Sequence, residues 1–169
     1  MPPLKNREAC GGERGFTLAE VMIVIVLMGL VFAIASASWF SMVESRRVDA
    51  ATNQMVSELR LTNTRATNQL SDWQVVHTVG SADYQLVRVD DGSVIDRSLP
   101  ENTKILSSEA NGPGGQRRLV FNPNGEVSAQ GGFTDSDGDG AIDLVVSSTD
   151  GNPQHSVSVI PATSRVKID

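Results

Sequence analysis

The chain has 169 residues, with 14 Lys and Arg against 20 Asp and Glu and a formal net charge of -6. This acid excess makes it a poor general binder of polyanions, because phosphate binding depends on clustered Lys and Arg side chains. The length allows one anchor and one modest globular domain, and the single cysteine, Cys10, excludes an internal disulfide.

The first element expected along the chain is an apolar helix. The 20 residues from Val21 to Phe40 carry no charge, and as a helix they would span about 30 Å, the thickness of the hydrocarbon core of a bilayer. One carboxylate, Glu20, stands where this run begins. An acid at that depth is costly in lipid and needs a partner, so Glu20 is a candidate functional residue.

The N-terminal segment has three interpretations. In the first, a leader is cut after Gly15 and the apolar helix is kept. In the second, Val21–Ile34 is the apolar stretch of a secretory signal that is cleaved at Ala35-Ser36-Ala37. The third is an uncleaved membrane anchor. The sequence favours the first, because Glu20 is unusual in a secretory signal and the helical pattern continues past Ala37 without a break.

The residues G-F-T-L-A-E from Gly15 to Glu20, followed by the apolar run, resemble the class III leader signature of type IV pilins and type II secretion pseudopilins. The resemblance implies that Gly15 is the last leader residue and that prepilin peptidase cuts before Phe16. It also implies that the same enzyme methylates the new N-terminal amine of Phe16. Glu20 matches the glutamate at the fifth position after the cut in that family.

Our hypothesis for Glu20 is subunit docking. In a filament its carboxylate would pair with the freed amine of Phe16 on a neighbouring subunit. A matched ion pair is tolerated in an apolar core, whereas an unpaired acid is not, so the pair would select the correct register. The alternative is an acid that extends to the headgroup boundary and has no partner.

After Phe40 the sequence becomes polar, but the helical period persists, and we predict one helix from about Thr17 to about Gln69. Its apolar stripe suits packing on a sheet and comprises Val48, Ala51, Met55, Leu59, Ala66 and Leu70, with a gap near Thr62. The expected divisions are a leader (1–15), a hydrophobic transmembrane or assembly helix (16–43), its amphipathic continuation (44–70) and a β-rich globular domain (71–169).

From Trp73 onward, short β-rich runs alternate with turn residues. The predicted strands are Trp73–Val79, Tyr84–Val89, Val94–Asp96, Arg118–Asn122, Ile142–Ser147, Ser156–Ile160 and Arg165–Ile168. Hairpin-type turns are expected at Asp91-Gly92, Asn124-Gly125 and Asp150-Gly151, and loops at 111–115 and 129–140. The fold class is therefore α+β, with a long N-terminal helix packed on a C-terminal antiparallel sheet domain.

The C-terminal half carries a narrower resemblance. The run L-V-F-N-P-N-G-E-V at Leu119–Val127 and the segment from Asp143 to Ile168 are similar to the end of GspH/FimT-type minor pseudopilins. Those proteins commonly place a glycine before the last strand, and here Ser164 stands at that position. The resemblance implies a pilin-like fold.

An acidic loop lies at D-S-D-G-D-G-A-I-D. Its carboxylates Asp135, Asp137, Asp139 and Asp143 fall at positions one, three, five and nine of an EF-hand-like pattern. Alternate carboxylates in a tight turn can converge on a hard cation, so calcium is the candidate ligand. Position twelve is Val146, which cannot supply the usual bidentate carboxylate. The alternative is a solvated acidic turn whose aspartates favour bends.

The sequence gives no indication of an enzyme or of a cofactor other than this calcium. After the leader there is no cysteine, and the two histidines, His77 and His155, lie far apart in strand-like runs. We find neither a nucleophile elbow nor a phosphate-binding loop. The residues therefore indicate a non-enzymatic structural subunit.

Together these observations predict a minor pilin or pseudopilin of a type IV pilus or a type II secretion system. Its partners would be other pilin-like subunits, prepilin peptidase and, before assembly, the cytoplasmic membrane, crossed once with the C-terminal domain outside. One alternative is a competence-type pilin that contacts DNA through Arg117, Arg118, Arg165 and Lys167. Another is a calcium-binding module exported after cleavage at Ala37.

Overall fold

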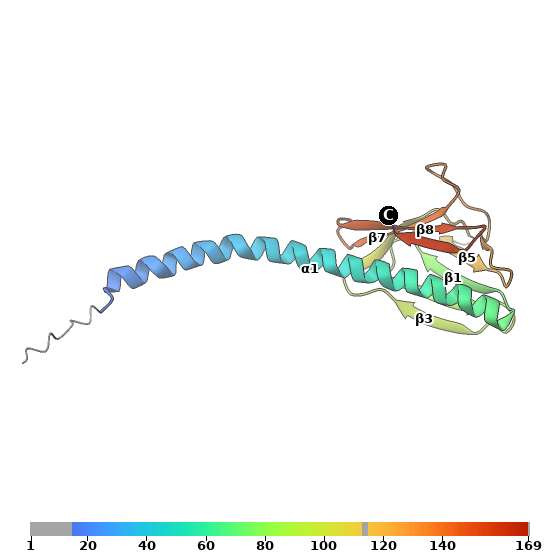
Figure 1. Ribbon diagram of the computed structural model, residues 1–169, viewed down its shortest axis with the longest axis horizontal. Helices are drawn as coiled ribbons and strands as arrows, with labels where there is room; N and C mark the ends of the chain where they lie inside the picture. The colour runs from blue at the N-terminus through green and yellow to red at the C-terminus, as the bar shows by residue number, and fades with distance from the viewer. Residues whose placement is uncertain (1–14, 113–114, 169) are drawn as a thin grey trace, which may run out of the picture. The chain divides into compact units, whose positions relative to one another are not determined.

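The structure is a computed structural model that describes residues 15–112 and 115–168. These residues form one helix and nine strands (Figure 1). The chain divides into two compact units, one up to Phe40 and the other from Ser41. The two units are described separately below, and helix α1 contributes residues to both.

Helix α1 (Leu18–Gln69) confirms the predicted helix to within one residue. No proline interrupts it, and the chain enters it at Thr17, a residue type that caps helix N-termini. The helix ends where Leu70 takes a left-handed conformation (φ 51°) and the Ser71 amide donates to the Ala66 carbonyl at 3.3 Å. This is a Schellman-type end. Near the N-terminus α1 is long and apolar enough to cross a bilayer, with a mean hydropathy of 2.8 in its most apolar window.

The globular unit is built on nine strands. They are β1 (Trp73–Thr78), β2 (Asp83–Arg88), β3 (Val94–Ser98), β4 (Thr103–Ser108), β5 (Gln116–Phe121), β6 (Val127–Ala129), β7 (Ile142–Ser148), β8 (Gln154–Ile160) and β9 (Arg165–Ile168).

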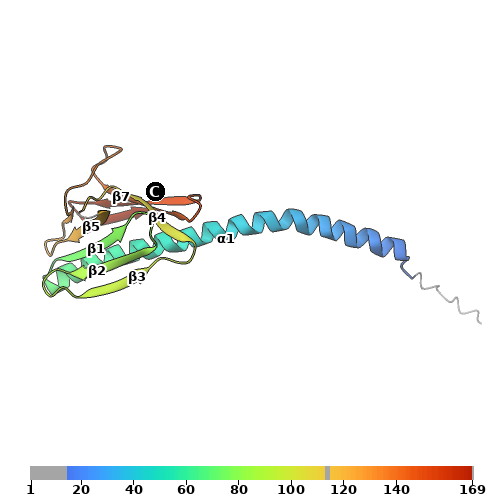
Figure 2. The same ribbon diagram turned by 180° about the vertical axis from the view of Figure 1, so that it is seen from behind.

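The strands form two antiparallel sheets. Sheet A has the order β3-β2-β1-β5-β6 and sheet B the order β4-β7-β8-β9. Seen from behind, β1, β2 and β3 lie alongside the C-terminal half of α1 (Figure 2). The three predicted turn glycines, Gly92, Gly125 and Gly151, join β2 to β3, β5 to β6 and β7 to β8, and each has a positive φ. The hairpin turns are therefore confirmed.

Two strands were missing from the sequence-based prediction. β4 contains only two large apolar residues and its pairing with β7 is shifted by a bulge between Ile105 and Ser107, so its sequence does not alternate cleanly. β6 is three residues long, and it includes Ala129, for which the sequence predicts a loop. Both strands are set by pairing with distant partners, which local alternation does not reveal.

The core lies between α1 and the two sheets. The helix residues Val48, Ala51, Met55, Leu59 and Ala66 are fully buried. Ala51, Met55, Leu59 and Ala66 share one core with large side chains from both sheets, among them Val75, Tyr84, Leu86, Leu119 and Phe121 from sheet A and Ile105, Ile142, Leu144, Val146, Val157 and Val159 from sheet B. The predicted amphipathic stripe therefore does cover the sheets.

One residue of that predicted stripe is wrong. Leu70 is 79% exposed, because it lies beyond the last helical turn in a left-handed conformation that points it away from the core. The gap near Thr62 is not a break in packing, since Thr62 is fully buried and its hydroxyl donates to the Glu58 carbonyl at 2.7 Å. A hydroxyl satisfied within the helix can occupy a core position.

Both sheets are fastened to each other and to the helix at their edges. The Ile105 amide of β4 donates to the Ser81 carbonyl at 2.9 Å, and the Val127 amide of β6 donates to the Pro161 carbonyl at 2.8 Å. From α1, Gln54 donates to the Ser98 carbonyl of β3 at 2.9 Å and Arg60 to the Val166 carbonyl of β9 at 3.0 Å. Each outer strand thus has at least one backbone group engaged outside its own sheet, which hinders pairing with a foreign strand at that point.

Ser164 takes the conformation of the glycine that it replaces in the family pattern. Its φ is 52°, in the left-handed region that favours glycine. The buried Ser164 hydroxyl donates to the Gly125 carbonyl at 2.5 Å and so ties the β8–β9 turn to the β5–β6 turn. A hydrogen bond across the two sheets therefore compensates for the strained backbone.

Candidate functional site

The first candidate site is the apolar segment of α1 in the N-terminal unit. From Val21 to Phe40 its large hydrophobic side chains are between 47% and 77% exposed. A continuous apolar surface of this kind marks a membrane or protein interaction site. This segment therefore needs apolar surroundings, either lipid or other helices.

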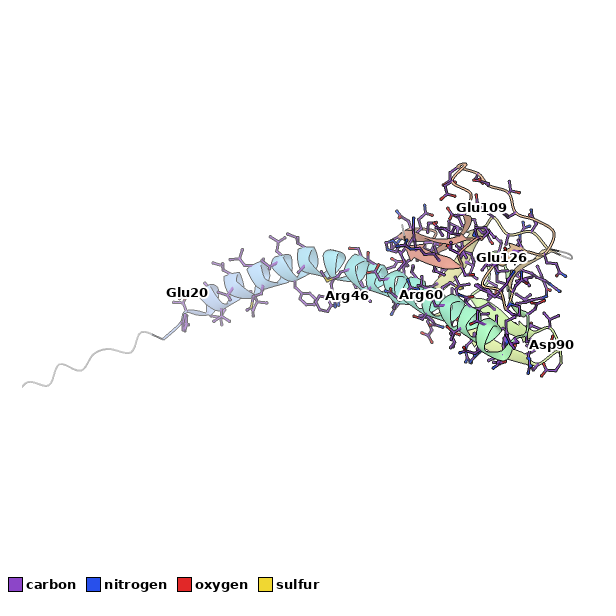
Figure 3. The ribbon with its side chains drawn as sticks, turned by 45° about the vertical axis from the view of Figure 1, so that its right-hand side comes forward. Glu20, Arg46, Arg60, Asp90, Glu109 and Glu126 are labelled. Carbon is purple, nitrogen blue, oxygen red and sulfur yellow. The ribbon has the colours of Figure 1, made fainter. Side chains whose placement is uncertain are left out.

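Glu20 lies in the first turn of α1, where Figure 3 labels it, and takes part in a capping box. The Thr17 hydroxyl accepts the Glu20 amide at 3.2 Å, and the Glu20 carboxylate accepts the Thr17 amide at 3.3 Å. This reciprocal pattern satisfies two backbone donors that the helix leaves free. A local structural role thus exists for Glu20 alongside the predicted docking role.

Gly15 and Phe16 precede the helix. Phe16 is 85% exposed, and a β-carbon placed on Gly15 would meet no atom within 4 Å. The chain itself therefore sets no steric requirement for glycine at position 15. The rest of the predicted leader, residues 1–14, lies outside the described residues. The alternative cleavage point, Ala35 to Ala37, falls inside α1, as the uninterrupted helical pattern predicts.

The second candidate site is the acidic loop between β6 and β7. The structure brings the carboxylates of Asp135, Asp137 and Asp139 to within 4.8 Å of one another, and all three are exposed. Asp135 accepts the Gly138 and Gly140 amides at 2.6 and 3.1 Å, and Asp139 accepts the Ala141 amide at 2.7 Å. These carboxylate oxygens therefore stabilise the turn, in agreement with the alternative interpretation of a solvated acidic turn whose aspartates favour bends.

The fourth predicted ligand, Asp143, does not join this group. It lies in β7, which pairs with β8, and a hydrogen bond joins the Asp143 carboxyl group to Ser158 of β8. Burial and the nearby carboxylates Glu109 and Asp139 raise the pKa of Asp143. Val146, at position twelve, is fully buried in the core. The calcium site stays a prediction that three of the four residues can support.

Glu109 organises this region and was not singled out from the sequence. Its carboxylate accepts the Ser136 amide at 2.8 Å and the Asp143 amide at 3.2 Å, and its carbonyl accepts the Thr134 amide at 3.0 Å (Figure 3 labels Glu109). Glu109 follows β4, the strand that the sequence missed, and is far from the loop in sequence. Only the pairing of β4 with β7 could have revealed it.

The four cations considered for DNA do not form one patch. Arg117 and Arg118 are successive residues of β5, so they point to opposite faces of sheet A. Arg165 and Lys167 belong to β9 of sheet B. Arg118 is also engaged, since it donates to Gln130 and Gln116 at 3.2 Å. This arrangement does not favour the DNA-binding alternative.

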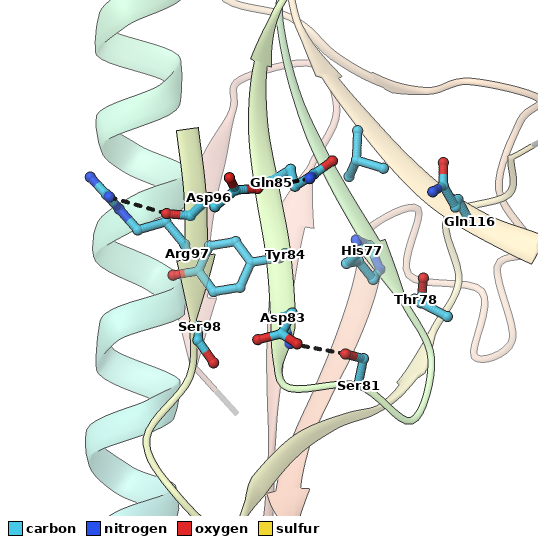
Figure 4. Close-up of a pocket in the computed structure, with 11 residues that line it drawn as sticks. His77, Thr78, Ser81, Asp83, Tyr84, Gln85, Asp96, Arg97, Ser98 and Gln116 are labelled. Atoms are coloured by element: carbon cyan, nitrogen blue, oxygen red, sulfur yellow. Dashed lines mark hydrogen bonds between the residues drawn. The ribbon is translucent and has the colours of Figure 1, made fainter. Parts of the chain in front are cut away.

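A cavity of about 580 Å³ lies on sheet A and is lined by residues of β1, β2, β3 and the start of β5 (Figure 4). The polar groups there bond locally: Gln85 donates to Asp96 at 2.8 Å, and the Ser81 hydroxyl accepts the Asp83 amide at 3.0 Å. Tyr84 points toward α1, where Gln54 donates to its hydroxyl at 3.2 Å. These contacts serve the fold, and they do not assemble a nucleophile with a base.

The two histidines are strand residues, as predicted, and they belong to different sheets. His77, in β1, is 2% exposed, and neither of its ring nitrogens has a hydrogen-bond partner among the described residues. Burial, with a smaller contribution from Arg117, lowers the pKa of His77 to about 4. His155, in β8, approaches Asp49 of α1 at 2.8 Å between Nε2 and Oδ1. Each histidine has a structural environment of its own.

Comparison with protein families gives two matches. Residues 11–36 match the model of the prokaryotic N-terminal methylation motif. Residues 51–151, more than half of the chain, match the model of type II transport protein GspH. The first match covers Gly15, Phe16 and Glu20, and the second extends from the amphipathic part of α1 into the β7–β8 turn.

The fold resembles solved structures of the minor pseudopilin EpsH from the type II secretion system of Vibrio cholerae. One is 16% identical with a TM-score of 0.53, and the match covers 73% of this chain and 96% of that one. A second is 15% identical with a TM-score of 0.53 and covers 75% and 94%. At this identity the likeness concerns the fold. A search of curated protein sequences gave no match.

Proposed function

This chain belongs to the family of type II transport protein GspH, and from that premise we propose how its two units serve a filament. It is a structural pilin-like subunit of a type II secretion system or a pilus, and it assembles with other pilin-like subunits. The observation that carries the proposal is the apolar surface of α1 from Val21 to Phe40, whose large side chains are exposed among the described residues.

The first part of the proposal concerns processing. Prepilin peptidase cuts between Gly15 and Phe16 and methylates the Phe16 amine. The support is the methylation-motif match over residues 11–36 together with the open position of Gly15 and the exposure of Phe16 ahead of the helix. An extended, unencumbered backbone is what a protease can engage.

The test of processing is the N-terminus of the chain recovered from membranes of its native host. Mass spectrometry is expected to find methylated Phe16 as the first residue. Gly15→Val should leave the leader attached, whereas Gly29→Val, the same change at another open glycine, should be processed normally. A mature chain that begins at Met1 or at Ser38 contradicts the proposal.

The second part concerns docking. We propose that the Glu20 carboxylate leaves its capping box with Thr17 when it pairs with the Phe16 amine of a neighbouring subunit. In leaving the capping box the carboxylate would give up its bonds to the Thr17 amide and hydroxyl, which are long at 3.3 Å. By contrast, a Glu20 carboxylate buried in the filament without the Phe16 amine would destabilise the assembly strongly. The pair therefore discriminates between correct and shifted registers.

Capping and docking can be separated by two substitutions. Glu20→Gln keeps an N3 side chain that suits a capping box but removes the charge, and Thr17→Ala removes the capping hydroxyl but keeps the charge. We expect Glu20→Gln to lower incorporation into filaments roughly tenfold or more, with Thr17→Ala close to wild type. The reverse pattern would assign Glu20 to the helix cap alone.

The third part concerns placement. Before assembly the chain crosses the cytoplasmic membrane once through the apolar part of α1, with its globular unit outside the cytoplasm. The support is the length and hydropathy of that segment and the cations Lys5, Arg7 and Arg14 on the leader side of it. Protease added to spheroplasts should digest the globular unit; a unit protected until lysis contradicts this orientation.

A further inference from the structure

An arginine pair, Arg46 and Arg47, follows the apolar segment of α1. Both residues are exposed, and within the described part of the chain no ion pair or hydrogen bond involves either side chain. Ala50 and Asn53, at helical spacing from the pair, are exposed as well, whereas the neighbouring Val48 is fully buried. The two guanidinium groups therefore lie on the face of α1 that the sheets leave open.

The acids nearest to the arginine pair are engaged elsewhere. Glu44 and Asp49 each lie three residues along α1 from one of the arginines, a spacing at which opposite charges on a helix can pair. Instead the Glu44 carboxylate accepts the Ser148 hydroxyl, and the Asp49 carboxylate lies 2.8 Å from His155 Nε2. Both contacts direct the acids toward sheet B. The charges of the arginine pair are therefore left for a partner outside the globular unit.

The distance along α1 brings the arginine pair to the surface of a bilayer. Phe40 ends the uncharged run, and Arg46 follows it by six residues of the same helix, a rise of about 9 Å. The polar headgroup layer on each side of a bilayer is about 5 to 8 Å thick. Helical side chains lean toward the N-terminus of their helix, which here is the lipid side, and arginine extends its charged end to the headgroups. Both guanidinium groups can therefore reach lipid phosphates.

The position of the pair opposes the usual charge bias of a membrane span. Lys and Arg close to a span favour its cytoplasmic side. Between Phe16 and Ser45 the sequence has no Lys or Arg, so after removal of the leader the cytoplasmic end of the span carries no basic side chain. The nearest basic side chains of the processed chain are then Arg46 and Arg47, at the outer end. A favourable contact at the outer surface would compensate for this reversed bias.

We propose that Arg46 and Arg47 bind the headgroups of anionic phospholipids at the outer surface of the membrane while the subunit is not yet assembled. A guanidinium group can donate two parallel hydrogen bonds to phosphate oxygens. The headgroup of phosphatidylglycerol contains no cation that competes for its phosphate, whereas phosphatidylcholine carries its own ammonium group. The proposal rests on the membrane placement stated under the proposed function, and it adds the class of lipid and the residues that bind it.

A tryptophan near the pair allows a direct test in the full chain, reconstituted into vesicles of phosphatidylcholine and phosphatidylglycerol. Trp39 is 68% exposed on the apolar segment, and bromine on the acyl chains of either lipid quenches a tryptophan that the lipid contacts. The Trp39→Phe variant supplies the emission of the buried Trp73, which is subtracted. Around Trp39 the binding constant of phosphatidylglycerol is expected to exceed that of phosphatidylcholine about fivefold, the effect of one arginine at an anionic surface. Salt at about 1 M should reduce this preference.

Three variants assign the preference to the arginine pair. The double variant Arg46→Gln/Arg47→Gln should bring the ratio of the two binding constants close to one, whereas Arg46→Lys/Arg47→Lys, which keeps both charges, should retain most of the preference. Lys167→Gln removes an exposed cation from β9, beside the Val166 carbonyl to which Arg60 donates farther along α1, and should leave the ratio unchanged. Equal melting temperatures would show that the variants are folded.

The outcomes separate the lipid contact from the membrane placement. If neither brominated lipid quenches Trp39, the placement in the membrane is wrong and the lipid contact falls with it. If both lipids quench Trp39 equally, or if the preference survives in Arg46→Gln/Arg47→Gln, the placement stands and the lipid contact alone is wrong. A double variant that keeps the preference but associates more weakly with other pilin-like subunits would assign the arginine pair to a protein contact instead.

Discussion

The two parts of helix α1 differ in what covers them. From Val21 to Phe40 the apolar side chains surround the helix and remain exposed, whereas from Val48 to Ala66 they form one stripe that the sheets of the same chain bury. The first part has the composition of a segment that is apolar on all faces, and the second that of an amphipathic helix. The same secondary structure thus serves two different environments.

This difference shows which contacts stabilise each unit. The globular unit has a closed core, occupied sheet edges and helix contacts such as the Arg97–Glu58 ion pair at 3.1 Å. The apolar segment has backbone hydrogen bonds but no side-chain core of its own within the described residues. Its packing energy is released only when lipid or other subunits cover it.

The largest expected effect comes from making the same substitution in both parts of α1. Leu59 is fully buried and Leu27 is 55% exposed. Leu59→Ala should destabilise the globular unit by about 3 kcal/mol, because it creates a cavity in the core. Leu27→Ala should leave that unit's unfolding unchanged and weaken filament incorporation. Denaturant unfolding of the detergent-solubilised chain measures the first effect, and filament yield the second.

If Leu27→Ala lowered the stability of the globular unit as much as Leu59→Ala does, the proposed difference between the two parts of α1 would be wrong. The apolar segment would then contribute to the core of the folded chain rather than to assembly. Leu61→Ala offers a second control, since Leu61 lies in the amphipathic part but is 40% exposed, and it should cost less than about 1 kcal/mol.

The second expected effect concerns pH and the buried His77. Its pKa falls from an ordinary 6.5 to about 4 in the folded chain. Between these values the unfolded chain binds the proton and the folded chain does not, so stability is complete above pH 6.5 and is lost as pH falls toward 4. The loss should reach about 3 kcal/mol at pH 4.

Unfolding free energies measured from pH 7 to pH 4 would test this prediction. The groups that face His77 across the sheet are Tyr84 and Arg117, and neither changes its charge in this range. His77→Gln should remove most of the slope below pH 6.5, whereas His155→Gln should not. A His77 resonance that titrates near 6.5 in the folded chain would contradict the buried neutral imidazole.

Features encoded by nearby residues could be read from the sequence. The helix ends, the turns at Gly92, Gly125 and Gly151 and the six-residue motif from Gly15 to Glu20 each depend on a few consecutive side chains. Strands β4 and β6 could not be read, because partners elsewhere in the chain impose them. The same holds for Glu109, whose carboxylate reaches the Ser136 and Asp143 amides only because β4 pairs with β7.

The capping box and the core show the same limit on single residues. Thr17 and Glu20 have the spacing of a capping box, but the apolar run that follows them indicated only a docking role for Glu20. Leu70 continues the periodic stripe in sequence, but the helix ends one residue before it. Periodicity predicts which face of a helix is apolar, and the cap geometry decides where that face stops.

A smaller effect is expected at Ser164, where the globular unit departs from the family's glycine. Ser164→Ala loses the hydrogen bond to the Gly125 carbonyl and keeps a side chain in the left-handed region, so it should cost about 1 kcal/mol. Ser164→Gly loses the same bond but relieves the backbone, and should be close to neutral. Equal losses for the two variants would show that the left-handed backbone carries no strain.

The smallest expected effect is that of calcium on the acidic loop, which belongs to the globular unit. The carboxylates of Asp135 and Asp139 already hold backbone amides, so an ion would replace existing bonds rather than order a free loop. At a concentration equal to its dissociation constant, calcium would stabilise the fold by about 0.4 kcal/mol. The stabilisation should grow on titration and vanish in Asp135→Asn, whereas Asp150→Asn should retain it. If calcium gives neither heat on titration nor a change in melting temperature, the loop is an acidic turn that its own carboxylates and Glu109 hold in shape.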